Sequence, residues 1–238
     1  MDNRDELGLM DCLDSGNALS GMQGDVDWSS DTLKYFAGLI SEIKGETMSE
    51  KPGHLNFTRR QPYGVVAKIN PFNHPLRFCA EKSAAALAAG NTVVVTASEQ
   101  APLSSLRFAE ICEQVLPAGV MNVLTGNAEC GDAMVRHPDV RRVGVVGSVA
   151  TGIAISKAAA EDLTHVSLEL GGKNPIIIFP DADPKKAASY AVKGMNMSRQ
   201  GQSCSSTSRV LVHHDLHDTV IEEMIKLVEN LPHWFAMD

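Results

Sequence analysis

The amino-acid sequence predicts an α/β fold in which a Rossmann-like parallel sheet is covered by helices on both faces. Strand-like and helix-like segments alternate along the middle of the 238-residue chain. The strand-like segments are continuously apolar, which is typical of strands buried on both faces. With 44% hydrophobic residues, the chain has enough apolar side chains for one large domain or two modest ones.

Before the alternation begins, the chain predicts helix and then a hairpin. Residues 29–45 have apolar side chains at helical spacing, an N-cap candidate at Ser30 or Asp31, and a stop signal at Gly45. Residues 55–69 change to β-rich composition with a turn at 61–64. We therefore expect a β-hairpin excursion near residues 46–62.

Strands and helices alternate from residue 64 onwards. The predicted strands are residues 64–70, 91–97, 120–126, 140–148, 164–172, 174–180 and 209–214. The predicted helices are residues 74–90, 102–119, 130–138, 151–161, 181–203 and 215–231. Helix between successive strands favours right-handed crossovers and therefore a parallel sheet.

Composition and charge argue against several classes of protein. A net charge of −8 without a basic stripe argues against a nucleic-acid partner. No apolar stretch approaches the ~20 residues that span a membrane, and the acidic N-terminus lacks an apolar signal core. We expect a cytoplasmic, reducing location. The five cysteines show no C-x-x-C spacing, so neither a disulfide framework nor a zinc cage is predicted.

Ligands of parallel sheets bind beyond the carboxyl ends of the strands. The loops expected there are rich in Asn, Ser, Thr, Glu and Gly: "NPFNHP", "TASEQAP", "TGNAECG", "GSVATG" and "ELGGKNP". Glu169 ends an apolar strand, so we expect a partly desolvated carboxylate that can act as a general base. Asn73 lies between two prolines, either as part of a rigid turn or as a fixed donor to an oxyanion.

Three further features leave alternatives open. Ser148 precedes a helix and suits a pyrophosphate, although close packing of glycines explains the same turn. Ser98 and Glu99 suit ribose hydroxyls or a helix-capping pair. His213, His214 and His217 lack companion ligands at metal spacing, so a solvated strand end is predicted and no metal is expected. Cys204, in "GQSCSS", is locally either a core thiol or a nucleophile.

Five motifs together, "PFNHP", "ASEQAPLS", "GSVATG", "LELGGKNP" and "GQSC", resemble the NAD(P)-dependent aldehyde dehydrogenase superfamily in order and spacing. The resemblance implies an NAD-binding domain at residues 1–170 and a partial catalytic domain at residues 171–238. It implies that Cys204 is the nucleophile, Glu169 the general base and Asn73 the oxyanion donor. The reaction implied is oxidation of a small-molecule aldehyde to the acid through a cysteine thiohemiacetal and thioester.

The resemblance also implies a set of cofactor contacts. They are Ile69, Pro71 and Phe72 beside the nicotinamide, Thr96, Ser98 and Glu99 near the adenosine ribose, Gly131 near adenine, Ser148 at the pyrophosphate, and Leu170 at the carboxamide. The family normally has a lysine where this chain has Thr96, so we expect weakened binding of NAD and little use of NADP. Val145 and Val146 replace the Phe-Thr pair that often precedes the Gly-Ser turn.

Relative to the family, the chain is expected to be shortened at both ends, with much of the catalytic domain and the oligomerisation strand absent. Family members form homo-oligomers, and uncovered sheet edges make the same assembly doubtful for a shortened chain. An inactive paralogue that acts as a nucleotide-binding or interaction module is the alternative function. A cofactor-free thiol esterase using Cys204 and Glu169 is a third.

Overall fold

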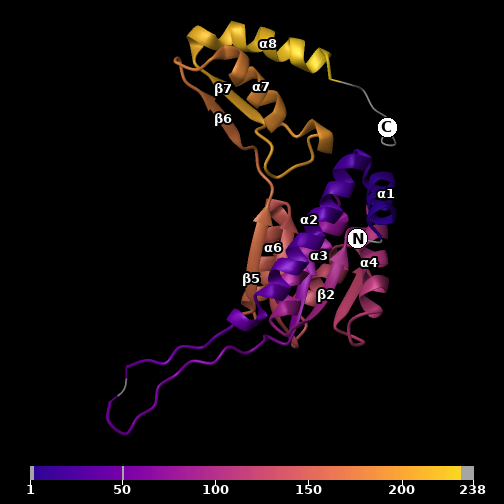
Figure 1. Ribbon diagram of the computed structural model, residues 1–238, viewed down its shortest axis with the longest axis vertical. Helices are drawn as coiled ribbons and strands as arrows, with labels where there is room; N and C mark the ends of the chain where they lie inside the picture. The colour runs from indigo at the N-terminus through magenta and orange to yellow at the C-terminus, as the bar shows by residue number, and fades with distance from the viewer. Residues whose placement is uncertain (1–2, 50, 232–238) are drawn as a thin grey trace.

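The computed structural model describes residues 3–49 and 51–231, so the remaining positions of the two predicted domains lie outside it. Its centre is a five-stranded parallel sheet with the strand order β3-β2-β1-β4-β5 (Figure 1). The strands are β1 (Val65–Ile69), β2 (Thr92–Ala97), β3 (Met121–Thr125), β4 (Val140–Gly147) and β5 (His165–Leu170). All four neighbouring pairs run parallel, which confirms the predicted fold class.

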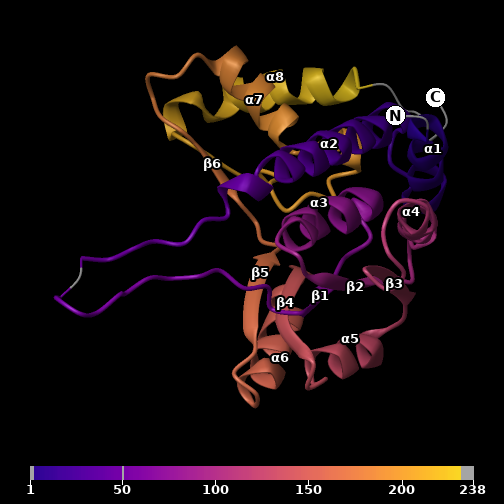
Figure 2. The same cartoon turned by 60° about the horizontal axis from the view of Figure 1, so that its bottom comes forward.

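Helices cover both faces of this sheet (Figure 2). One face carries α3 (Pro75–Ala88) and α4 (Leu103–Glu113), and outside them lie α1 (Arg4–Ser15) and α2 (Leu19–Gly38). The other face carries α5 (Ala128–Val135) and α6 (Val149–Ala160). Each face has its own apolar cluster, with Val93, Val95 and Phe108 in the first and Val143, Val145 and Ile155 in the second. The central strands β1, β2 and β4 are therefore largely buried, as their continuous apolar runs predict, whereas β5 at the edge of the sheet is half-exposed.

A smaller unit follows the main sheet. The strands β6 (Pro175–Ile178) and β7 (Arg209–Val212) pair in parallel. The helices α7 (Pro184–Gly194) and α8 (His217–Glu229) pack together beside them, around a core of Ile178, Ala187, Ala188 and Val220. Two short 3-10 turns, η2 (Met197–Arg199) and η3 (His214–Leu216), flank β7.

Residues 43–49 and 51–64 form an extended excursion that projects away from the sheet (Figure 1). Its two arms are joined antiparallel by the Thr47–Phe57 bridge, so the reversal lies between these residues. The predicted turn at 61–64 is wrong, because Gly64 already accepts a hydrogen bond from Thr92 N at 2.9 Å as the chain enters β1.

The predicted helix start at Ser30 or Asp31 is also wrong. The helix α2 begins at Leu19, and both residues lie inside it. It ends at Gly38 rather than Gly45, and a short 3-10 turn, η1 (Ile40–Glu42), follows. Within the residues that the structure describes, no helix is long and apolar enough to cross a membrane.

Candidate active site

Cys204 lies in the loop between α7 and β7, residues 195–208, hereafter the cysteine loop. Its side chain is exposed. Asn174 fixes the backbone on one side by donating from Nδ2 to the carbonyl oxygens of Cys204 at 2.6 Å and Ser206 at 3.2 Å. Asn196 and Gln200 adopt left-handed backbone with φ of 54° and 55°. Such conformations cost free energy in non-glycine residues, so neighbouring contacts must hold this loop in shape.

Asn73 lies in the loop between β1 and α3, residues 70–74, hereafter the asparagine loop. Its Nδ2 donates to the carbonyl oxygen of Gln202 at 2.9 Å. Its own carbonyl oxygen accepts from Asn17 Nδ2 at 3.1 Å. The structure therefore brings the predicted oxyanion donor against the cysteine loop, two residues before Cys204, although 129 residues separate the two bonded partners in sequence.

Glu169 differs from expectation. Its side chain is 64% exposed, so the predicted desolvation of this carboxylate is wrong. Glu169 Oε1 lies 3.6 Å from Lys82 Nζ, on the face of the sheet that α3 covers. In the described part of the chain no hydrogen bond joins Glu169 to Cys204. An outward carboxylate at the end of β5 must turn before it can activate water near the thiol.

Glu169 lines a cavity of about 280 Å³ together with Lys68 and Lys82. Burial, with the nearby charges of Arg142 and Lys82, lowers the pKa of Lys68 to about 8. Its side chain crosses Gly144 of β4, where an added Cβ would lie 2.9 Å from Lys68 Nζ. The glycine therefore leaves the room that this lysine occupies.

The residues expected beside the nicotinamide follow β1. Ile69 ends the strand, Pro71 is half-buried, and Phe72 is 39% exposed. Gly131 of α5 is buried against this segment, since a Cβ there would meet Ile69 Cδ1 at 3.5 Å. Four predicted cofactor contacts are thus neighbours at the carboxyl edge of the sheet.

Thr96, Ser98 and Glu99 come from the end of β2. The Thr96 side chain is buried, and its hydroxyl lies 3.7 Å from Cys130 Sγ and 3.5 Å from Met134 Sδ. Ser98 and Glu99 lie in a turn before α4. The capping alternative for this pair is wrong, because α4 begins at Leu103, whose backbone N–H is capped by Asp14 Oδ2 at 3.0 Å.

Ser148 and Leu170 end the neighbouring strands β4 and β5. Ser148 is the N-cap of α6, and its Oγ accepts from Thr151 N at 3.1 Å. Gly152 packs against Leu170, since an added Cβ would lie 2.9 Å from both methyl groups of that leucine. Close packing therefore accounts for Gly152. The other free amides of the first turn still make this helix start suited to an anion.

The carboxyl edge suits a dinucleotide in two respects. The first turn of α6 carries no acidic side chain, and the exposed apolar residues Val149 and Ile153 lie on that helix. A pyrophosphate needs the free amides of the helix start, and flat rings need apolar surface. Phe72 adds an exposed ring across the edge.

Sequence reasoning missed a buried carboxylate beneath both loops. Asp25 of α2 has a side chain that is only 3% exposed. Its Oδ2 lies 2.6 Å from His74 Nδ1, and its Oδ1 accepts from Arg199 Nη2 at 3.1 Å. These partners belong to the asparagine loop and the cysteine loop, so the contact joins three distant segments. No local sequence pattern signals it, because Asp25 is one polar residue among many in α2.

Two other buried polar groups lie near the asparagine loop. Burial raises the pKa of the Asp11 carboxyl to about 7, although Leu76 N donates to its Oδ2 at 3.3 Å. Asn70 is buried, and neither polar atom of its side chain has a hydrogen-bond partner in the described residues. An asparagine at the end of an apolar strand was the available signal for Asn70.

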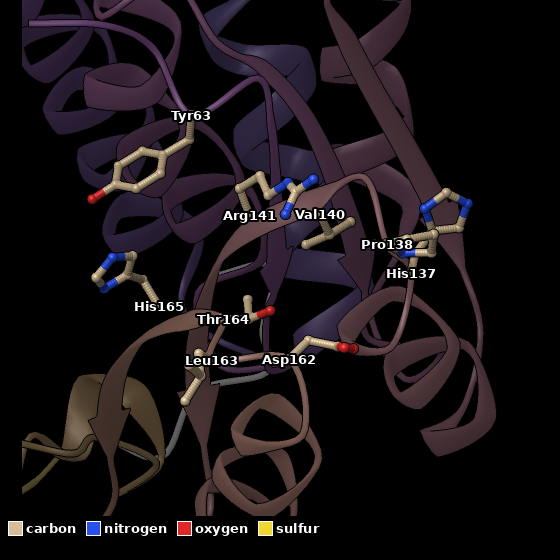
Figure 3. Close-up of a pocket in the computed structure, with 9 residues that line it drawn as sticks. All are labelled: Tyr63, His137, Pro138, Val140, Arg141, Asp162, Leu163, Thr164 and His165. Carbon is tan, nitrogen blue, oxygen red and sulfur yellow. The ribbon is translucent and has the colours of Figure 1, made fainter.

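Another cavity, of about 450 Å³, lies away from these loops (Figure 3). Its lining comes from the amino ends of β4 and β5 and the segment before β1, and includes Tyr63, Arg141 and His165. Ligands of parallel sheets bind at the opposite edge. The half-buried His213 and the exposed His214 and Asp215 form a group at the end of β7, with ligand atoms within 4.8 Å of one another.

Comparison with known proteins decides the family. The model of the aldehyde dehydrogenase family matches residues 1–234. The chain belongs to the aldehyde dehydrogenase family. It is 44% identical over 229 residues to aldehyde dehydrogenase tropH from Talaromyces stipitatus, a match that covers 94% of this chain and 44% of that protein.

Solved structures agree. The NAD+ complex of an aldehyde dehydrogenase from Bacillus cereus matches with a TM-score of 0.94 and 38% identity, over 100% of this chain and 49% of that one. An NADP-dependent enzyme from E. coli matches with a TM-score of 0.94 and 32% identity, over 100% of this chain and 50% of that one. The chain thus spans about half the length of the relatives that it matches.

Proposed function

We propose that this chain carries the nucleophile and the oxyanion donor of an enzyme that oxidises a small-molecule aldehyde to the carboxylic acid. The observation that carries the proposal is the hydrogen bond from Asn73 Nδ2 to the Gln202 carbonyl oxygen. It places an amide donor against the loop whose exposed thiol is Cys204. Both groups are needed for acyl chemistry, a nucleophile and a fixed donor for the developing oxyanion.

The thiolate of Cys204 attacks the aldehyde carbon, and a C–S bond forms while the carbonyl oxygen becomes an oxyanion. Asn73 donates to this oxyanion in the thiohemiacetal. The hydride acceptor that converts the thiohemiacetal to a thioester is a nicotinamide dinucleotide when one is bound. Glu169 then takes a proton from water, which attacks the thioester, and the C–S bond breaks to release the acid and the thiol.

Glu169 needs one movement to do this, because its carboxylate now faces Lys82. Its exposure makes that rotation cheap, since an exposed ion pair contributes only about 0–1 kcal/mol. Two of the other cysteines, Cys79 and Cys112, are poorer nucleophiles. Burial raises the pKa of Cys79 to about 12 and that of Cys112 to about 11, so few thiolates form there near neutral pH.

We further propose NAD rather than NADP as the cofactor. Ile69, Pro71, Phe72 and Leu170 would contact the nicotinamide half, and the start of α6 at Ser148 would receive the pyrophosphate. Glu99 is exposed beyond β2, where its carboxylate would bind ribose hydroxyls and repel a 2′-phosphate. Gly131 and Thr96 complete the adenosine side.

The experiment is an assay of NADH formation with a panel of aldehydes, comparing Cys204→Ala with Cys112→Ala. The first variant is expected to lose activity at least a hundredfold, because the nucleophile is gone. The second removes a buried thiol of α4 and is expected to keep it. Activity that survives in Cys204→Ala would contradict the proposal. Binding of NAD without turnover would favour a nucleotide-binding module instead.

Cofactor binding gives a second test at Thr96. We expect Thr96→Lys to tighten NAD binding up to about fivefold, the effect of a partly exposed ion pair or charged hydrogen bond. The lysine must emerge past Cys130 and Met134, which cover the threonine hydroxyl. Titration calorimetry measures the dissociation constant, and an unchanged value would contradict the assignment of Thr96 to the cofactor site.

A further inference from the structure

We propose that Asp25 is a positioning residue that holds the asparagine loop and the cysteine loop at a fixed separation through His74 and Arg199. The expected effect of Asp25 on catalysis rests on the proposed function, whereas its expected effect on the order of the two loops does not. Asp25 lies in α2, outside both loops and outside the carboxyl edge of the sheet. It acts on the reaction only through its two partners.

The Asp25 carboxylate contacts both loops. Its two oxygens are divided between the two loops, with Oδ2 beside His74 Nδ1 at 2.6 Å and Oδ1 beside Arg199 Nη2 at 3.1 Å. His74 directly follows Asn73, and Arg199 precedes Cys204 by five residues. Arg77 Nη1 of α3 lies farther off, at 3.6 Å from Asp25 Oδ1, while Arg77 Nε donates to Glu81 Oε2 at 3.0 Å.

All three side chains of this contact are largely shielded from solvent. The side chains of Asp25, His74 and Arg199 are 3%, 11% and 17% exposed. Charged hydrogen bonds are strong where water is excluded, and a buried carboxylate that loses a partner is costly. The three side chains therefore stay together far more firmly than a surface ion pair would.

The cysteine loop contains strained backbone that needs support from its neighbours. Asn196 and Gln200, on either side of Arg199, have left-handed backbone. Arg199 Nη2 also donates to the Gly21 carbonyl oxygen at 3.1 Å, and Gln200 Nε2 donates to the Ser15 carbonyl oxygen at 3.2 Å. The helices α1 and α2 thus hold the strained segment from outside, and Asp25 supplies the charge that Arg199 needs.

Contacts that do not involve Asp25 hold the same two loops. The asparagine loop is held a second time from the segment between α1 and α2, where Asn17 Nδ2 donates to the Asn73 carbonyl oxygen. The two loops are then joined directly by Asn73 and Gln202. An error of about 1 Å in the distance between an oxyanion donor and a nucleophile can lower a rate about a hundredfold. A common anchor for both loops removes that freedom.

The test compares Asp25→Asn with Asp27→Asn, a half-exposed aspartate two residues along the same helix that pairs with Arg4. In Asp25→Asn, amide hydrogen exchange is expected to rise at least tenfold in residues 70–78 and 196–206 together. Asp27→Asn is expected to leave both segments unchanged. With aldehyde and NAD, Asp25→Asn is expected to lower kcat 10- to 100-fold and to change KM for NAD less than threefold.

Variants of Arg199 distinguish a positioning role from a general contribution to the stability of the fold. Arg199→Lys keeps a charge for Asp25 and is expected to restore part of the kcat that Arg199→Met loses. The double variant Asp25→Asn, Arg199→Met is expected to be no slower than the worse single variant, because the two residues act as a pair. Additive losses would contradict the anchor.

A second pair of variants tests whether the changes come from loss of the anchor or from general misfolding. Gly21→Ala adds a Cβ at 3.0 Å from Arg199 Nη1, whereas Gly24→Ala, in the same helix, meets nothing within 4 Å. Both raise helix propensity. Only Gly21→Ala is expected to increase exchange in residues 196–206, by about two- to fivefold. Equal behaviour of the two variants, or no linked change in the two loops of Asp25→Asn, would overturn the proposal. Absence of turnover in the unmodified chain would contradict the proposed function alone.

Discussion

The carboxyl edge of the five-stranded sheet and the cysteine loop are held in place by different forces. At the edge, strands are fixed by parallel ladders and by apolar side chains on both faces. The cysteine loop has no ladder, and polar groups from α1, α2, Asn73 and Asn174 hold it. The proposed cofactor site therefore shares the stability of the whole sheet, whereas the position of Cys204 depends on a few bonds that can be removed singly.

The largest effect on stability is expected from a substitution in the apolar core of the sheet. Phe108 of α4 is 9% exposed in the cluster that covers β2. Phe108→Ala is expected to lower the free energy of unfolding by about 3–5 kcal/mol, because a buried ring leaves a cavity. Urea denaturation measures the loss. Hydrogen exchange in the cysteine loop of the native protein is expected to stay unchanged, and a selective rise there would break the comparison.

A smaller effect is expected at Asp11, between α1 and α3. Because burial raises its pKa to about 7, the folded state binds a proton that the unfolded state releases between about pH 4 and pH 7. The stability that protonated Asp11 contributes is therefore present at low pH and lost as pH rises through 7. Asp11→Asn is expected to raise the unfolding free energy at pH 8 by about 2–4 kcal/mol, at ~1.4 kcal/mol per pKa unit.

Urea denaturation at pH 5 and pH 8 measures this change. The exposed Asp132, which pairs with Arg136, is the control, and Asp132→Asn is expected to stay within about 1 kcal/mol at both pH values. Equal effects of Asp11→Asn at the two pH values would show that Asp11 is not protonated in the folded state.

The smallest effect is expected from a matched pair of asparagines, one in each region. Asn174 donates to two carbonyl oxygens of the cysteine loop, and Asn122 donates to the carbonyl oxygens of Val93 and Gly119 at the sheet. Each change to alanine is expected to cost about 1 kcal/mol. Only Asn174→Ala is expected to raise hydrogen exchange at residues 203–207. The same response in Asn122→Ala would erase the distinction between the regions.

The parallel sheet could be predicted because continuous apolar strands such as 91–97 leave few other folds. The start of α2 could not, since residues 19–29 contain Gly21, Gly24 and several polar residues that weaken the helical pattern. Its inner side mixes the buried Met22 with the buried Asp25, which meets Arg199, a partner 174 residues away. A contact of that range leaves no periodic trace in one sequence.

The sequence assigns members to the candidate site, and that assignment stays a prediction; the geometry of the site was less predictable. Asn73 and the cysteine loop meet, as the family resemblance led us to expect, through a backbone carbonyl that no motif reveals. Glu169 ends an apolar strand, but the end of β5 is open, so its carboxylate faces solvent and Lys82. Apolar neighbours in sequence therefore did not imply a desolvated side chain.

The central claim is that Cys204 forms a thioester that Glu169 helps to hydrolyse. Glu169→Gln removes the base but leaves the nucleophile and Asn73, so it is expected to accumulate the acyl group on Cys204. Peptide mass spectrometry after incubation with an aldehyde and NAD measures this directly. We predict an acyl adduct on the Cys204 peptide and none on the peptides of the other four cysteines. NADH formation without a Cys204 adduct, or an adduct on another cysteine, would contradict it.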